Sequence, residues 1–162
     1  MTNQSEWPAD DIETIMNQYG DMLYRLCVLM LKNESDAEDV VQETIIKYFR
    51  KSPAFENCEH EKAWLIRVAT NECRDLLRFR VRHPQIDGDY LERISCDSPD
   101  SGIMEALASV PEKFRLVLTL YYIEDYRVED IAKIINRTSS AVKMRLQKGR
   151  KLLKKIYREE YL

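Results

Sequence analysis

Glycine and proline are scarce in this sequence, with four and five respectively among 162 residues. β-Sandwiches and β-barrels need many turn residues, so this scarcity favours an all-helical fold. The chain has only two histidines and lacks a glycine-rich phosphate loop, an HExxH motif and a Ser/His/Asp set, which argues against an enzyme. No apolar run approaches the roughly 20 residues of a membrane span, and residues 1–11 lack the regions of a signal peptide. We therefore expect a cytoplasmic protein that is not an enzyme.

The four cysteines are spread along the chain and form no CxxC pair. They are Cys27, Cys58, Cys73 and Cys96, and cysteines of this kind in a cytosolic chain are typically reduced thiols. Cys58 and His60 do not have a standard zinc-ligand spacing. We expect neither a metal site nor another cofactor.

Charge alternates in blocks along the chain, although the net charge is only −3. Residues 1–60 carry 12 acids and 5 bases, and residues 61–82 carry 3 acids and 6 bases. Residues 83–126 carry 9 acids and 3 bases, whereas residues 127–162 carry 4 acids and 11 bases. A basic stretch is the electrostatic footprint of phosphate binding, and this chain has two of them.

Hydrophobic residues recur every three to four positions through most of the chain, which predicts amphipathic helices. The expected helices cover residues 15–31, 36–49, 62–80, 103–109, 111–123, 128–135 and 139–157. Residues 83–102 contain two prolines, two glycines and five acids against one arginine, which is the composition of a linker. The sequence therefore predicts an all-α protein, in which an N-terminal module (residues 1–82) and a C-terminal module (residues 103–162) are joined by an acidic linker.

Residues 127–151 have the pattern of a helix-turn-helix with a basic second helix. Asn136 permits the left-handed backbone of a tight turn, and Thr138 can cap the second helix. The inward stripe of that helix comprises Val142, Leu146, Gly149 and Leu153, and close packing against the preceding helix would explain the glycine. The candidates for reading base edges lie on the other face and are Ser140, Lys143, Met144, Gln147 and Lys148. The alternative interpretation is a solvated basic face of a helical bundle.

The helix expected over residues 62–80 has one apolar and one polar side. The polar side gathers Trp64, Arg67, Asn71, Arg74, Asp75 and Arg78. An aromatic ring among cations and an amide suits unstacked bases, because the ring stacks, the cations bind phosphate and the amide reads base edges. Two other roles remain open: Trp64 packs under the preceding loop, and the remaining side chains form a solvated face.

The helix expected over residues 36–49 has an acidic outer face. Glu38, Asp39, Gln42 and Glu43 face outward, and Ile46 and Phe49 are expected to be exposed apolar side chains beside them. An acidic patch with exposed apolar residues suggests a protein partner that has a basic surface. The alternative is a solvated face at the edge of the core.

Together these segments closely resemble the extracytoplasmic-function (ECF) sigma factors of bacterial RNA polymerase. The resemblance covers about Ile15–Tyr157 and rests on three blocks in this order: DAEDVVQETIIKYF, then AWLIRVATNECRDLLR, then PEKFRLVLTLYYIEDY with VEDIAKIINRTSSAVKMRLQKGRKLLKK. It implies a transcription initiation factor that binds core polymerase, melts the minus-ten promoter element and reads the minus-thirty-five duplex. It also implies an anti-sigma factor as a partner and no insertion into a membrane.

The resemblance assigns roles to residues of each module. The acidic helix would bind the clamp helices of the polymerase β′ subunit through Asp39, Gln42 and Glu43. The helix Trp64–Arg78 would hold the non-template strand, and the loop from Phe55 to Glu61 would receive a flipped base. The minus-ten candidates are thus Phe55, Trp64, Arg67, Asn71, Arg74, Asp75 and Arg78, and the five base-reading candidates of the C-terminal module belong to the minus-thirty-five duplex. The alternative is a helix-turn-helix transcriptional regulator that acts without being a polymerase subunit.

Overall fold

The computed structural model describes residues 9–51, 54–83 and 101–161, which are helical apart from short connections and contain no strand. The elements in chain order are α1 (Ala9–Leu31), α2 (Glu34–Lys51), α3 (Cys58–Arg82), α4 (Ser101–Ser109), α5 (Glu112–Leu118), the π-helical turn η1 (Thr119–Ile123), α6 (Val128–Ile135) and α7 (Ser139–Tyr161). The expected all-α class is confirmed. Most of the predicted linker, residues 84–100, lies outside the described residues, and α4 begins at Ser101, two positions before the predicted module boundary.

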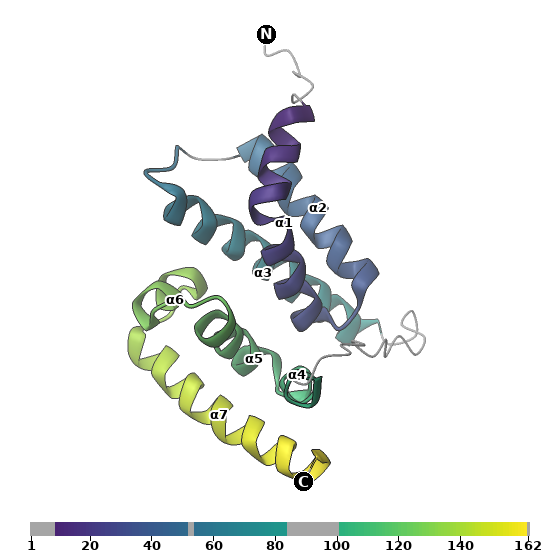
Figure 1. Cartoon of the computed structure of the whole chain (residues 1–162), viewed down its shortest axis with the longest axis vertical. Coiled ribbons are helices and arrows are strands. Elements are labelled where there is room, and N and C mark those ends of the chain that lie inside the picture. Colours follow the sequence, from purple (N-terminus) through teal and green to yellow (C-terminus); the bar gives the residue numbers. More distant parts are fainter. Residues whose placement is uncertain (1–8, 52–53, 84–100, 162) are drawn as a thin grey trace.

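Helices α1, α2 and α3 pack around one apolar core (Figure 1). Leu23, Leu26 and Ile66 are fully buried in this core. Asn33 caps α2, because its Oδ1 accepts the backbone N–H of Asp36 at 2.9 Å. The helical periodicity of the sequence located all three helices, but α1 begins at residue 9 rather than 15 and α3 at residue 58 rather than 62.

The helix-turn-helix forms as the sequence predicts. Asn136 adopts the left-handed conformation with φ 55° and ψ 52°, which ends α6. Thr138 caps α7 by accepting the N–H of Ala141 at 3.1 Å. Arg127 is the N-cap residue of α6, and its side chain makes no capping hydrogen bond. The result is a short helix, a tight turn and a long basic helix that runs along the outer side of the C-terminal module (Figure 1).

Two details of the C-terminal module differ from the sequence prediction. The helix expected over 111–123 is α-helical only to Leu118 and ends in η1. The hydroxyl of Thr119 donates to the carbonyl of Arg115 at 2.8 Å, a side-chain bond that bends helices. The close neighbour of Gly149 is α5 rather than the preceding helix, because a Cβ there would lie 3.0 Å from Leu118 Cδ1.

The two modules pack against each other, and a buried arginine lies at their junction. Arg115 of α5 donates hydrogen bonds of 2.9 Å to the carbonyls of Ala108 and Val110, which surround the turn between α4 and α5. It also donates a 2.8 Å bond to the carbonyl of Met30 near the end of α1. Burial lowers the pKa of Arg115, yet arginine remains charged in proteins, so these carbonyls must compensate the buried cation.

Further contacts between the modules surround this junction. Arg25 of α1 pairs with Glu124 at 2.9 Å, and Lys62 of α3 lies 5.2 Å from the ring centre of Tyr126. The packed arrangement thus joins α1 and α3 to the segment that leads into the helix-turn-helix.

No helix among the described residues is both long and apolar enough to cross a membrane.

We predict that Arg115→Met lowers the free energy of unfolding by about 3 kcal/mol, because three carbonyls lose a charged donor that no apolar side chain replaces. Equilibrium urea unfolding followed by circular dichroism measures this change. The matched control is Arg158→Met on the exposed face of α7, which should change stability by less than about 0.5 kcal/mol. Equal stability of the two variants would contradict the role of Arg115.

Candidate nucleic-acid interface

The outer face of α7 presents all five candidates for reading a duplex. Ser140, Lys143, Met144, Gln147 and Lys148 are all exposed. Val142 and Leu146 are buried on the opposite side, as the predicted stripe requires, and Met144 is 53% exposed despite its apolar side chain. An exposed polar and cationic stripe on the second helix of a helix-turn-helix can enter a major groove.

The polar face of α3 is partly covered by the C-terminal module. The Arg67 guanidinium donates to the backbone carbonyls of Lys133 and Ile134 at the end of α6. Arg74 pairs with Glu112 of α5 at 3.1 Å. Two of the minus-ten candidates are therefore engaged by the other module in this arrangement.

The remaining polar candidates of α3 stay accessible. Asn71 is exposed, and Asp75 and Arg78 are each 70% exposed with 3.6 Å between their charged atoms. An exposed pair of this kind contributes little to stability, so either side chain can exchange its partner for a ligand at small cost. The face thus divides into an engaged part at Arg67 and Arg74 and an open part at Asn71, Asp75 and Arg78.

Phe55 and Trp64 belong to one aromatic cluster around Tyr48. The ring of Phe55 stacks on Tyr48 with centroids 5.9 Å apart, and the Trp64 ring lies edge-on to Phe55 at the same distance. Both Phe55 and Trp64 are half-buried. The structure therefore favours packing of Trp64 under the preceding loop, the alternative that the sequence left open, and leaves only part of each ring for stacking with a base.

Glu61 holds this cluster to α1. Its carboxylate accepts the hydroxyl of Tyr19 at 2.6 Å and that of Tyr48 at 2.9 Å. Burial, followed by the hydrogen bond to Glu61, raises the pKa of Tyr48 to about 12, so this phenol is a neutral donor near neutral pH. The segment from Phe55 to Glu61 is consequently tied to α1 and α2. It is not a loop throughout, as the sequence predicts, because α3 begins at Cys58.

The acidic face of α2 is exposed except at Glu43, and its apolar neighbours are half-buried. Asp39 and Gln42 are exposed and Glu43 is half-buried. Ile46 and Phe49 are half-buried rather than exposed, and Phe49 packs against the core. The expectation of an exposed apolar pair was wrong, because the C-terminal part of α2 lies closer to the core than an isolated helical wheel indicates.

Cys27 and Cys73 are buried free thiols, and Cys58 is exposed. The neighbouring Cys27 thiol, together with burial, raises the pKa of Cys73. Cys96 lies outside the described residues. No group of three or more potential metal ligands occurs within residues 9–51, 54–83 and 101–161.

Sequence reasoning missed the polar residues that join the modules. Arg115 is one cation within the apolar run FRLVL, and Glu112 looked like an ordinary surface acid. The only available signal was the arginine itself, at a position where the helical period requires a buried side chain. Nothing local identifies its carbonyl partners.

Comparison with known protein families gives two matches in chain order. The family model for sigma-70 region 2 matches residues 15–83, and the model for sigma-70 region 4 matches residues 101–153. Together they span about three quarters of the chain. The first contains α2 and α3, and the second contains the helix-turn-helix.

Similar curated proteins are sigma factors. The chain is 29% identical to RNA polymerase sigma factor SigV of Bacillus subtilis, with 87% of each chain covered. It is 28% identical to ECF RNA polymerase sigma factor SigW of the same species, with 93% of this chain and 90% of SigW covered. It is 30% identical to ECF sigma factor SigE of Mycolicibacterium smegmatis, over 94% of this chain and 63% of SigE.

Two solved structures share the fold. The sigma factor RpoE, in complex with the anti-sigma factor NepR from Bartonella quintana, matches 94% of this chain and 99% of its own, with a TM-score of 0.74 and 21% identity. CnrH, in complex with the cytosolic domain of CnrY, matches 95% of this chain and 92% of its own, with a TM-score of 0.70 and 21% identity.

Proposed function

Because the chain belongs to the sigma-70 family, and within it to the ECF sigma factors that direct core RNA polymerase to promoters, we propose a residue assignment for each step of promoter recognition. The assignment divides the chain into an N-terminal sigma domain (residues 1–82), an acidic linker (83–102) and a C-terminal DNA-binding domain (103–162). A single observation carries it: the five exposed base-reading candidates of α7 lie on a helix-turn-helix within the region 4 match. A regulator outside polymerase is not favoured, because it would not need a region 2 match over residues 15–83.

The acidic face of α2 binds core polymerase in this proposal. Asp39, Gln42 and Glu43 present negative charge and an amide to solvent, so their partner is a basic surface such as the β′ clamp helices. Charge complementarity of this kind speeds association and fixes the register of the complex. Support for this role comes from the exposure of Asp39 and Gln42 on one side of the helix.

The polar face of α3 and the loop before it hold the melted minus-ten element. Arg67, Arg74 and Arg78 supply cations for the phosphates, and Asn71 and Asp75 supply groups for base edges. Phe55 and Trp64 offer partly exposed ring faces for a displaced base. Arg67 and Arg74 become available only when their contacts with α6 and Glu112 break.

Promoter binding therefore requires the modules to separate. The minus-ten and minus-thirty-five elements lie about 25 base pairs apart, which is roughly 85 Å along a duplex. A compact chain of this length has a radius of gyration of only about 15 Å. A segment as long as residues 84–100 can span at most about 60 Å, enough to connect two separated modules.

In the C-terminal module, α7 enters the major groove of the minus-thirty-five element. Lys143, Gln147 and Lys148 can donate to base acceptors, and Met144 offers an apolar contact. Arg145 and Arg150 lie on the flanks of this stripe and are suited to phosphates. We also propose that the protein acts in the cytoplasm, where its polymerase is, and that an anti-sigma factor regulates it, as NepR and CnrY are partners of the structural relatives.

The first test is the affinity for bacterial core RNA polymerase. Asp39→Arg should weaken this binding at least about tenfold, because it places a cation opposite a basic partner surface. Glu13→Arg, an equal charge change at an exposed position of α1, is the matched control and should bind like the wild type. Equal affinities for Asp39→Arg and the wild type would remove α2 from the interface, and no binding by the wild type would refute the proposed function.

The second test concerns the base-reading face. Lys148→Ala should weaken binding to a minus-thirty-five duplex by about 1–3 kcal/mol, and by unequal amounts on duplexes with different sequences. Fluorescence anisotropy with a panel of single-base variants of the duplex measures both effects. Lys155→Ala, at an exposed position two turns further along α7, should lower affinity slightly and uniformly. A uniform loss for Lys148→Ala would reassign this lysine to a phosphate contact.

A further inference from the structure

The two basic segments of the sequence meet in one cleft between the modules. Its volume is about 640 Å³, within the range of small-molecule sites. Seven arginines and one lysine line it: Arg74, Arg78, Arg80, Arg82, Lys113, Arg115, Arg137 and Arg145. We refer to this site as the arginine cleft.

The acidic residues in and around the arginine cleft are too few to pair with all of its cations. Its one acidic lining residue, Glu112, pairs with Arg74, and Asp75 and Asp36 reach Arg78 and Arg80 from the rim. Four cations have no ion pair among the residues that the structure describes: Arg82, Lys113, Arg137 and Arg145. The arrangement therefore leaves uncompensated positive charge in an open cleft.

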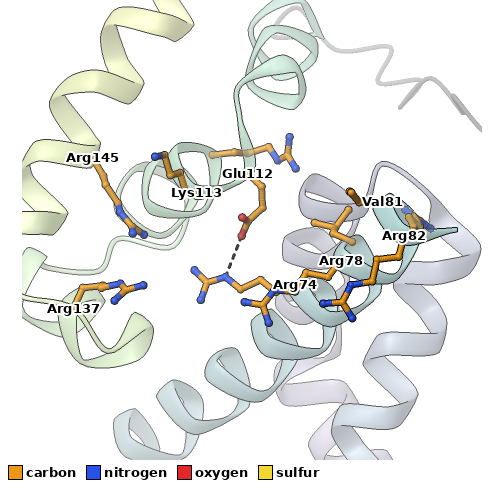
Figure 2. Close-up of a pocket in the computed structure, with 11 residues that line it drawn as sticks. Arg74, Arg78, Val81, Arg82, Glu112, Lys113, Arg137 and Arg145 are labelled. Carbon is orange, nitrogen blue, oxygen red and sulfur yellow. Dashed lines mark hydrogen bonds and ion pairs between the residues drawn. The ribbon is translucent and has the colours of Figure 1, made fainter. Parts of the chain in front are cut away.

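The side chains converge from both modules. Figure 2 shows Arg74 of α3 pointing across the arginine cleft toward Arg137 and Arg145, which come from the helix-turn-helix. Burial, with added repulsion from Arg137 and Arg74, lowers the pKa of Arg145. An anion between these groups would relieve the repulsion and bind both modules at once.

We propose that the arginine cleft binds a free oligophosphate, a short chain of phosphate groups, and that the bound ligand holds the two modules together. Guanidinium forks pair with phosphate oxygens in a bidentate manner, and several forks around one space match a chain of phosphates. None of the described lining residues is aromatic, so a nucleobase finds no stacking partner there. The chemistry of the site thus selects phosphate groups rather than a nucleoside.

The consequence for transcription rests on the proposed function. Arg74 and Arg78 are assigned to the minus-ten strand, so an oligophosphate that occupies them competes with promoter DNA. Because it also contacts Arg137, it favours the packed arrangement over the separated one by binding only the former. The ligand would therefore inhibit the binding of promoter DNA, although it does not contact the base-reading residues of α7.

The test uses the full chain and tripolyphosphate as the probe, with calorimetric titration at constant ionic strength. We expect saturable binding with one site per chain, at least about tenfold tighter than that of orthophosphate or sulfate. A titration in which the three anions bind equally weakly, as expected for unspecific screening, would overturn the proposal.

Arginine substitutions locate the site. Arg82→Ala and Arg137→Ala take one cation from each module and touch none of the residues assigned to DNA reading or polymerase binding. Each should weaken tripolyphosphate binding by about tenfold. The matched control is the pair Arg50→Ala and Arg158→Ala, also one exposed arginine from each module but outside the cleft, which should leave binding unchanged. Equal losses in both pairs would place the ligand elsewhere.

Two further arms identify the source of the phosphates. If a mixed-sequence single-stranded DNA oligonucleotide binds more tightly than tripolyphosphate and depends equally on Arg82 and Arg137, the cleft is a nucleic-acid site and the proposal fails. It also fails if tripolyphosphate binds only after neutralisation of Asp87, Asp89, Glu92, Asp97 and Asp100, since the linker would then be the natural anion. Core-polymerase affinity of the same variants reports separately on the proposed function.

Discussion

A buried guanidinium organises the arrangement on which the other features depend. Arg115 bonds to carbonyls at the end of α1 and around the turn into α5, so a single side chain fixes both modules. A buried cation stabilises a structure only when all its partners are in place, because its desolvation is costly. This requirement makes the junction specific: a shifted register between the modules would break the bond that crosses between them, and the carbonyl of Met30 and one guanidinium N–H would lose their partners.

Around this junction, the proposed function gives the same residues roles in two incompatible states. Arg67 and Arg74 bind α6 carbonyls and Glu112 when the modules are packed, and the proposal assigns both cations to the melted DNA strand. Contacts of this size, of about 1 kcal/mol each when partly exposed, can be exchanged for phosphate contacts. In the proposed function, the packed state therefore covers part of the DNA-binding face with contacts that are weak enough to be exchanged.

Local structure could be predicted from the sequence, whereas contacts between the modules could not. Helical spacing, Asn136 and Thr138 identified the helix-turn-helix and its inward stripe, because these signals act within a few residues. The bond from Arg67 to α6 and the partner of Gly149 depend on residues far along the chain. The base-reading candidates on α7 were correctly expected to be exposed, but half-buried Trp64 and Phe49 show that one helix alone does not determine burial.

The account is tested most directly by the distance between two spin labels, one on the native Cys58 and one at position 158 of an Arg158→Cys variant. Cys96→Ser removes a further labelling position, and Cys27 and Cys73 can stay because they are buried. One position belongs to each module. The account predicts a single short distance in the free protein and an increase of several tens of ångströms in the complex with core polymerase and promoter, where the bound elements lie roughly 85 Å apart. An unchanged distance distribution in that complex would contradict it.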